Sequence, residues 1–377
     1  MKLRTVRAIA RKEYLHLLRD FRSLYLAFAV PLLLILLFGY ALSLDVDHIP
    51  TVVVDHDHTP QSRDLVRQLD ASPYFQVDRL VTETRSLSNL LDCNQAALGI
   101  VIPPGWSADL HADRMSSLQI LIDGSDPNYA GLTRSYMLAF VSQYNRRQLA
   151  GYLNRQGIEP LHVPVEGRLR VWFNEDLESR NFIVPGIIAI IIMIVGAILT
   201  SLVIAREYEN GTMETLRSLP ISGLELFTGK AIPYFIICLI DVLIAVLIGQ
   251  LLFNVVIKAS FWLLLLASGL YILVALALGL LISMKTKSQL VANQMAIIIT
   301  YLPSLLLSDF VFPVTNMPPI LQMLTRLVPA TYFIDILNGL YLRNLGLAVL
   351  WPSYLVLAVM GGVLILLNLR AMRREGL

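Results

Sequence analysis

Acidic and histidine side chains alternate in one short stretch, Asp55-His56-Asp57-His58. In an extended chain His56 and His58 point to the same side, and two carboxylates lie next to them. Imidazole and carboxylate groups are ligands that Zn²⁺ and Cu²⁺ accept, so a metal site is one hypothesis. The other is a polar turn that ends a strand, with Asp57 or Thr59 capping the next helix. We favour the turn and predict no metal site.

The sequence contains no motif for ATP binding or for nucleophilic catalysis. No GxxxxGK[ST] segment occurs, and Gly229-Lys230 is followed by Ala231 and enters an apolar run, so it is no phosphate loop. HExxH, GxSxG and Cys/His ligand spacings do not occur either. The chain is therefore expected to have no catalytic residues and no cofactor of its own.

Several polar residues fall within or beside runs that are otherwise apolar: Asp241, Gln289, Asn293, Gln294, Asp309, Asp335 and Asn338. Polar groups are costly in hydrocarbon, so their presence is informative. One interpretation is hydrogen bonding between helices or a position at the lipid headgroups. The other is a polar lining of a substrate path or of a dimer seam. The candidates for such a path or seam are Asp241, Asn293, Gln294, Asp309 and Asp335.

An apolar run with an abrupt charged end organises the chain. Residues 183–205 are apolar and long enough to cross a bilayer, which takes about 20 such residues. Arg206, Glu207 and Glu209 follow directly, and such a cluster does not remain in hydrocarbon. The run therefore ends at a membrane surface, and the residues after it lie in water.

A short amphipathic helix is predicted directly after this charged end. Gly211 and Thr212 supply a break and an N-cap, so a helix can start near Met213. Met213 and Leu216 lie three residues apart on one face, and Glu214 near the helix start suits the helix dipole. Such a helix either docks with something soluble or is a solvated turn between two spans. The residues alone leave both interpretations open.

Residues 205–222, AREYENGTMETLRSLPIS, resemble the loop after the second span in permease subunits of type-2 ABC exporters. In that family the loop carries a coupling helix that touches the ATPase subunit. The resemblance implies an ATPase-coupling role for Glu207, Glu209, Gly211, Thr212, Met213, Glu214, Leu216 and Pro220. It also implies that ATP is bound by a cytosolic ABC ATPase partner and not by this chain.

The composition indicates a membrane protein with a sizeable soluble part. Of 377 residues, 56% are hydrophobic and 15% are charged, whereas soluble globular proteins carry about 25% charged residues. The net charge of +2 says little about partners, and no stretch resembles a nucleic-acid-binding patch, so no nucleic-acid partner is predicted. Cys93 and Cys238 fall in different predicted environments, so no disulfide is expected. The predicted fold class is an α-helical polytopic membrane protein of about six transmembrane helices, with an inserted extracytoplasmic α/β domain.

The N-terminal segment interleaves basic and apolar residues. At residues 1–23 the apolar positions recur at helical spacing, which predicts a cytoplasmic amphipathic entry helix on the membrane surface; a solvated basic tail is the alternative. The first span is predicted at residues 24–44, where Pro31 is tolerable. The positive charge before it places the N-terminus in the cytoplasm. The apolar run is too long for a cleavable signal peptide.

Residues 45–180 change character, because charges return and apolar runs shrink to strand length. Helical patterns separate the runs, and the longest extends from Tyr129 to about Leu153. This alternation predicts a compact α/β domain of roughly 130 residues, which lies outside the cell if the N-terminus lies inside. The predicted strands are 51–57, 75–81, 96–104 and 117–125, with a last candidate at 167–174.

The remaining chain is divided by hydropathy into spans and loops. Four prolines interrupt residues 310–346, so two short helices on the outer side are predicted there and not a simple span. An excess of Lys and Arg places both termini in the cytoplasm. The predicted order is a second span at 181–205, a cytoplasmic coupling-helix loop at 206–229, spans at 230–257, 261–284 and 291–309, outer re-entrant helices at 310–346, a last span at 347–369 and a cytoplasmic tail at 370–377.

Further landmarks match the exporter subfamily that has a large external loop. They are FGYAL, ILIDGSDPN, VWFNEDLESRNFIVPG and FPVTNMPPILQ with PATYFIDIL. The resemblance implies a permease of the bacterial inner membrane that exports drug-like or lipophilic molecules. It also implies a second permease copy or a related permease, and in some members a periplasmic adaptor protein. The chain departs from the family at Phe21, where Pro is more common, and at Asp309, where Gly is.

Three hypotheses follow from the sequence. The leading one is half of a dimeric exporter pore driven by ATPase subunits, in a lipid bilayer. The second is a membrane-anchored sensor or scaffold whose external domain binds a ligand, although about six spans are excessive for an anchor. The third, a membrane-embedded enzyme, lacks any catalytic signature.

Overall fold

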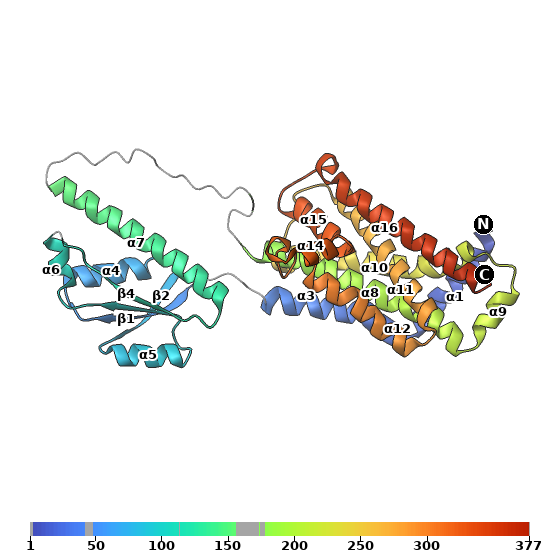
Figure 1. Ribbon diagram of the computed structural model, residues 1–377, viewed down its shortest axis with the longest axis horizontal. Helices are drawn as coiled ribbons and strands as arrows, with labels where there is room; N and C mark the ends of the chain where they lie inside the picture. The colour runs from blue at the N-terminus through green and yellow to red at the C-terminus, as the bar shows by residue number, and fades with distance from the viewer. Residues whose placement is uncertain (1–2, 42–47, 113, 156–172, 174–177, 377) are drawn as a thin grey trace. The chain divides into compact units, whose positions relative to one another are not determined.

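The computed structural model divides the chain into two compact units (Figure 1). The helical unit comprises Met1–Ser43 and Arg170–Leu377, and the sheet unit comprises Leu44–Leu169. The sheet unit therefore lies between two parts of the helical unit in the sequence. The residues that the structure describes are 3–41, 48–112, 114–155, 173 and 178–376.

Five helical runs in the described part of the helical unit are long and apolar enough to cross a membrane. One of them, Gln289–Leu306, contains a π-helical turn, η2 (Ile297–Tyr301), between α12 (Gln289–Ala296) and α13 (Leu302–Leu306). The other four are α8 (Arg180–Glu209), α10 (Gly223–Phe253), α11 (Phe261–Thr286) and α16 (Leu347–Arg374). The chain is thus a polytopic helical membrane protein.

The proline-rich segment forms two short helices, as predicted. They are α14 (Pro319–Thr325) and α15 (Pro329–Tyr341), and they are bent by 78° relative to each other. Each begins with proline at its first position, where the missing N–H costs no hydrogen bond. If the bent pair is counted as one span, the described residues contain six candidate spans.

The first predicted span is less regular than expected. Here α2 (Phe21–Leu24), a π-helical turn η1 (Tyr25–Ala29) and α3 (Val30–Ala41) follow one another, and the apolar helix Ala27–Tyr40 is too short to count among the five. The whole helical run still measures about 30 Å at 1.5 Å per residue, close to the thickness of the hydrocarbon core. The end of the predicted span lies outside the described residues.

Several helices extend beyond the predicted spans. α10 begins at Gly223 and not near Lys230, because Ser222 and Glu225 form a capping box. The Ser222 hydroxyl accepts the N–H of Glu225 at 3.4 Å, and the Glu225 carboxylate accepts the N–H of Ser222 at 3.2 Å. Where the membrane begins along these helices stays a prediction.

The core of the helical unit is built around α8, which is buried along most of its length. It approaches α11 closely at Gly279, where an added Cβ would lie 2.1 Å from the Thr200 hydroxyl and 2.4 Å from the Ala197 carbonyl oxygen. The Thr200 hydroxyl donates to the carbonyl of Leu276 at 3.2 Å. Small residues and hydroxyl bonds of this kind drive helix association in lipid.

The sheet unit contains four described strands in the order β2-β1-β3-β4. β1 is parallel to β2 and to β3, whereas β4 is antiparallel to β3. The strands fall where the hydropathy pattern predicts them, except the candidate at 167–174, which lies outside the described residues apart from Phe173. They are β1 (Ile49–Asp55), β2 (Phe75–Val81), β3 (Leu98–Ile102) and β4 (Gln119–Ile122).

Helices cover both faces of this sheet, as Figure 1 shows. Val53 of β1 packs in one core with Leu65, and its neighbours Val52 and Val54 pack in the other with Leu87. A strand that is apolar on both sides is typical of a sheet covered on both faces. One face carries α4 (Pro60–Asp70), α6 (Trp106–His111) and α7 (Pro127–Arg155), and the other carries α5 (Thr84–Asp92). On which side of a membrane this unit lies stays a prediction.

The Asp55–His58 stretch forms the polar turn. The Asp55 carboxylate accepts the N–H groups of Asp57 at 2.9 Å and His58 at 3.0 Å. Thr59 caps α4, as predicted, by accepting the N–H of Ser62. The Asp57 carboxylate accepts the Thr59 hydroxyl at 2.7 Å and the N–H of Ser107 at 3.2 Å, so both carboxylates are engaged within the protein. Within the described ranges, no group of three His, Cys, Asp or Glu side chains is arranged to hold a metal ion.

Candidate functional site

A short helix, α9 (Thr212–Ser218), follows α8 as predicted, but its cap differs. The N-cap is Gly211, whose φ of +70° is a left-handed conformation that favours glycine. Thr212 is the first helical residue and not the cap. Its hydroxyl donates to the Glu207 side chain, which ties the start of α9 to the end of α8.

The apolar face of α9 packs on its own protein. Met213 is buried and Leu216 is half-buried against the core of the helical unit. Glu214, Thr215 and Ser218 are exposed. The face that is free to meet another molecule is therefore polar, and Met213 and Leu216 position the helix.

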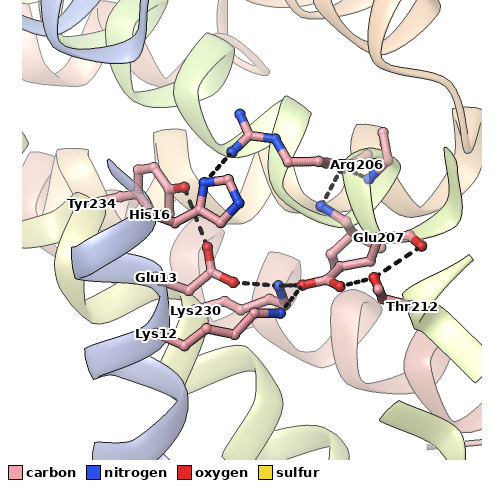
Figure 2. Close-up of polar contacts among 11 residues, drawn as sticks. Lys12, Glu13, His16, Arg206, Glu207, Thr212, Lys230 and Tyr234 are labelled. Atoms are coloured by element: carbon pink, nitrogen blue, oxygen red, sulfur yellow. Dashed lines mark hydrogen bonds and ion pairs between the residues drawn. The ribbon is translucent and has the colours of Figure 1, made fainter. Parts of the chain in front are cut away.

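Three buried charged side chains and the exposed Lys12, from α1 (Leu3–Arg19), α8 and α10, form an ion cluster (Figure 2). Lys230, which is 1% exposed, lies 2.6 Å from Glu13 and 2.9 Å from Glu207. Lys12 lies 2.7 Å from the same Glu207 oxygen. Two lysines thus compensate two carboxylates. We call Lys12, Glu13, Glu207 and Lys230 the buried ion cluster.

The buried ion cluster links segments that are far apart in the sequence. Taking a lysine and a carboxylate out of water costs several kcal/mol each, an amount recovered only when both are well paired. Any displacement of α8 relative to α1 or α10 would weaken that pairing. Because Glu207 also accepts the hydrogen bond from Thr212, the cluster sets where α9 begins.

α1 packs directly against α10 next to this cluster. Val6, Ile9, Glu13 and Leu17 recur at helical spacing and are buried. A Cβ at Gly229 of α10 would lie 2.7 Å from the Cβ of Ile9, so the two helices approach through this glycine. A helix forms here as predicted, and the face with these apolar residues meets protein; its position at a membrane surface stays a prediction.

Other polar contacts hold the end of α8 in place. Arg206 pairs with Asp20 at 3.2 Å. Its guanidinium group also contacts the His16 ring, at 3.1 Å, and Figure 2 shows this second contact. Glu209 accepts the backbone N–H of Gln289 at 2.8 Å and its side-chain amide at 2.5 Å. The charged end of α8 is therefore bound both to α1 and to the start of α12.

The C-terminal residues complete the site. Glu375 pairs with Arg217 of α9 and, at 2.8 Å, with Lys287 in the turn between α11 and α12. The Lys287 ammonium also lies 4.8 Å from the centre of the Tyr208 ring. The hydrogen bond from Lys287 lowers the pKa of the Glu375 carboxyl from its ordinary value. Glu375 thus joins α9 to the α11–α12 turn.

We expect Glu375→Gln to loosen α9. The amides of α9 should exchange faster with solvent at neutral pH, and the melting temperature should fall by an amount that corresponds to less than about 1 kcal/mol, because the pairs are partly exposed. Since folding lowers the pKa of Glu375, its contribution exists above the unfolded-state pKa and disappears as pH falls through the folded-state value. Wild type and variant should therefore converge in acid. The matched control is Glu214→Gln, which removes an exposed carboxylate of α9 that has no bonding partner among the described side chains. An equal effect of both variants would contradict the prediction.

The structure divides the predicted coupling residues into two groups. Glu207, Met213 and Leu216 face the protein, whereas the others are exposed, namely Glu209, Gly211, Thr212, Glu214 and Pro220. Lys230, Glu13 and Glu375 were missed by sequence reasoning. A lysine inside the first turns of an apolar helix and a glutamate on the apolar stripe of a basic helix were the available signals.

The predicted path residues do not form one cluster. Asp241 is buried in α10, and Asn293 and Gln294 lie on α12. The Asp309 side chain accepts the N–H of Val314 at 2.8 Å, and Asp335 accepts the Ser353 hydroxyl at 2.6 Å. Among the described residues no hydrogen bond joins any two of the five. Asp309 closes a turn, and Asp335 holds α15 to α16.

Two apolar cavities flank α13 in the helical unit. One, of about 520 Å³, lies between α13, α16 and the turn that joins α14 to α15. The other, of about 570 Å³, lies between α13 and the segment before α14. Both are lined by Pro303 and Leu307. The two cavities are large enough for small apolar molecules on either side of α13.

Comparison with known proteins agrees with these features. A model of the ABC-2 family transporter protein matches residues 21–370. The chain is 34% identical to the probable multidrug ABC transporter permease YbhS of Escherichia coli K12, covering 90% of this chain and 89% of that protein. It is 30% identical to the probable multidrug ABC transporter permease YbhR of the same organism, covering 92% of each. The chain is also 26% identical to the inner membrane transport permease YhhJ of Escherichia coli K12, over 86% of this chain and 85% of that protein.

Proposed function

This chain belongs to the ABC-2 family of transporter proteins, and from that membership we propose that it is the permease half of a dimeric, ATP-driven exporter. Membership implies a transport membrane subunit with an ABC ATPase as its partner. ATP is bound and hydrolysed by that partner, and this chain converts the partner's movement into transport.

The observation that carries the proposal is the way α9 is held. Its apolar residues and the buried ion cluster fix one side, and a polar face with Glu214 remains exposed. A rigidly anchored helix with a free polar face suits docking of a soluble subunit. A displacement of α9 by a bound subunit would be transmitted to α8 through Glu207 and to α10 through Lys230.

A lipophilic or drug-like substrate is supported by two observations. Two relatives carry the name of probable multidrug permeases. The cavities beside α13 are lined almost wholly by apolar side chains. Such substrates partition into the bilayer and would approach α13 from lipid.

A dimer is supported by α12. The Gln294 side chain is exposed there, in a helical run that otherwise suits a membrane. An amide is costly in hydrocarbon unless it is hydrogen-bonded, and a second copy would supply a partner. Gln294, with the half-buried Asn293, is thus the candidate for the seam.

The proposed orientation puts both termini and α9 in the cytoplasm of a bacterial cell and the sheet unit outside the inner membrane. Figure 1 places the two ends of the chain and α9 at the same end of the helical unit. Basic residues are frequent at that end, including Arg217, Lys285, Lys287 and Arg373, in accord with the positive-inside rule. A periplasmic adaptor, which would meet the sheet unit, stays a prediction.

The test is purification of the tagged full-length chain in mild detergent from its host, with ATPase activity measured on the eluate. We expect an ABC ATPase to co-purify. Gly211→Val should reduce the coupled activity several-fold, because a branched residue in a left-handed conformation costs about 1–2 kcal/mol. Gly211→Asn, which adopts that conformation more readily, should retain most of it.

Absence of an ATPase subunit under conditions that keep the complex intact would refute the exporter proposal. The hypothesis of a sensor or scaffold would then take its place, and ligand binding by the sheet unit would be the next measurement. Equal activity of the Val and Asn variants would show that the backbone at Gly211 does not matter for coupling.

A further inference from the structure

α1 has a second ordered face besides the one that packs on α10. Arg4, Arg7, Arg11, Tyr14 and Leu18 recur every three or four residues, and all five are exposed. At about 100° per residue the middle of this stripe lies roughly 135° around the helix from the middle of the buried residues of α1. The helix therefore has a protein face and a free face, and we call this stripe the free face of α1.

The free face carries positive charge that nothing in the described structure compensates. Arg4, Arg7 and Arg11 make no ion pair with a described acidic residue. The acidic groups closest in sequence are engaged elsewhere, because Glu13 turns inward to Lys230 and Asp20 pairs with Arg206. A partner for this face must supply negative charge.

The free face also continues into a surface that belongs in lipid. Leu18 is followed at helical spacing by Phe21, which is 79% exposed, and then by the exposed Tyr25. Leu33 and Leu37 are exposed further along the first predicted span. Side chains of such a span face hydrocarbon, so the free face lies where the acyl region of the bilayer meets its headgroups.

We propose that the free face of α1 binds anionic phospholipids of the surrounding bilayer. Its arginines pair with lipid phosphates, and Tyr14 and Leu18 enter the boundary between headgroups and acyl chains. A helix with interleaved basic and apolar residues fits that boundary better than it fits water. The fixed negative charge of an anionic leaflet supplies the partner that the three arginines lack.

This surface is linked to α9 through the buried ion cluster. Lys12 and Glu13 lie on the same helix as the arginines and contact Glu207 and Lys230. Lipid bound to α1 would therefore help to fix the residue that positions α9. If the chain is an exporter permease, its coupled ATPase activity should depend on anionic lipid; this consequence rests on the proposed function.

The experiment measures lipid binding by the purified full-length chain in detergent, using native mass spectrometry and the melting temperature. Phosphatidylglycerol should bind more tightly than phosphatidylcholine and should raise the melting temperature more. The triple variant Arg4→Gln, Arg7→Gln and Arg11→Gln should weaken phosphatidylglycerol binding roughly 100-fold, as three surface charges imply. Its melting temperature in phosphatidylcholine should equal that of wild type, which shows that it folds.

The matched control removes three exposed arginines of the sheet unit, Arg79→Gln, Arg85→Gln and Arg134→Gln, and should bind phosphatidylglycerol as wild type does. Equal loss in the control would mean a general charge effect and would overturn the proposal. An equal shift of the melting temperature produced by inorganic phosphate would make the face a site for soluble anions. If the triple variant, unlike wild type, lost a co-purifying ATPase in phosphatidylcholine, the face would be a protein-docking face. The lipid measurements need no ATPase, so they stand even if the exporter proposal fails.

Discussion

Lys230→Met is expected to destabilise the helical unit by about 3–5 kcal/mol, the usual cost of removing one partner from a buried ion pair. Methionine fills a similar volume but leaves Glu13 without its lysine partner, and Glu207 keeps Lys12 alone among the described lysines. Glu13 is then a buried carboxylate with no paired cation among the described side chains. Unfolding in sodium dodecyl sulfate, followed by circular dichroism, measures the loss, and ATPase activity of the complex measures the effect on coupling.

A double variant separates charge imbalance from simple loss of packing. Lys230→Met with Glu13→Gln leaves Lys12 paired with Glu207 at 2.7 Å, so charge is balanced again. We expect the double variant to recover more than half of the stability that the single variant loses. Lys285→Met, which removes an exposed lysine near the end of α11, should change little. If the double variant is less stable than Lys230→Met, the pairing does not determine stability.

Gly279→Ala is expected to have the second large effect, because it forces α8 and α11 apart. The added methyl group would overlap the Thr200 hydroxyl and the Ala197 carbonyl oxygen. Overpacking of a tight core usually costs about 1–3 kcal/mol, and here the obstacle includes backbone, which yields less than a side chain. The expected result is a lower yield of folded protein and a lower melting temperature in detergent.

Two further variants test the cause of that effect. Gly362→Ala changes a helical glycine of α16 with open space around it, and the melting temperature should stay the same or rise slightly. Thr200→Ala added to Gly279→Ala should rescue only part of the stability, because the Ala197 carbonyl remains at 2.4 Å. Full rescue, or an equal effect of Gly362→Ala, would contradict the proposed close approach.

Local features of the fold were predictable where neighbouring residues determine them. Thr59 caps α4, and prolines divide residues 310–346 into short helices, because these effects act within one turn. Thr212 was wrongly predicted as a cap. Gly211 takes that position in a left-handed conformation, and the Thr212 hydroxyl bonds to Glu207. Two residues that can cap a helix are adjacent here. The hydrogen bond from Thr212 to Glu207 of α8 accompanies the placement of Gly211 at the N-cap, and the sequence alone does not reveal that contact.

The candidate site was only partly predictable. The charged end of α8 and the short helix after it follow from hydropathy and helix-breaking residues. Which face of α9 is free did not follow, because Met213 and Leu216 suit a core of the same protein as well as a partner's surface. The helix α1 was predicted to lie on the membrane surface, and the sequence did not reveal that its apolar stripe packs on α10.

By itself the sequence determined a polytopic membrane protein with a separate α/β unit, a charged helix end and no ATP-binding motif. Those conclusions rest on composition and on periodic patterns, which are local properties of the chain. Only the tertiary structure decided that Lys230 meets Glu13, 217 positions away, and that Glu375 meets Arg217. A charged residue in a sequence has many partners available, and which one it meets depends on how the helices pack. The positioning of α9 is therefore a property of the assembled helices.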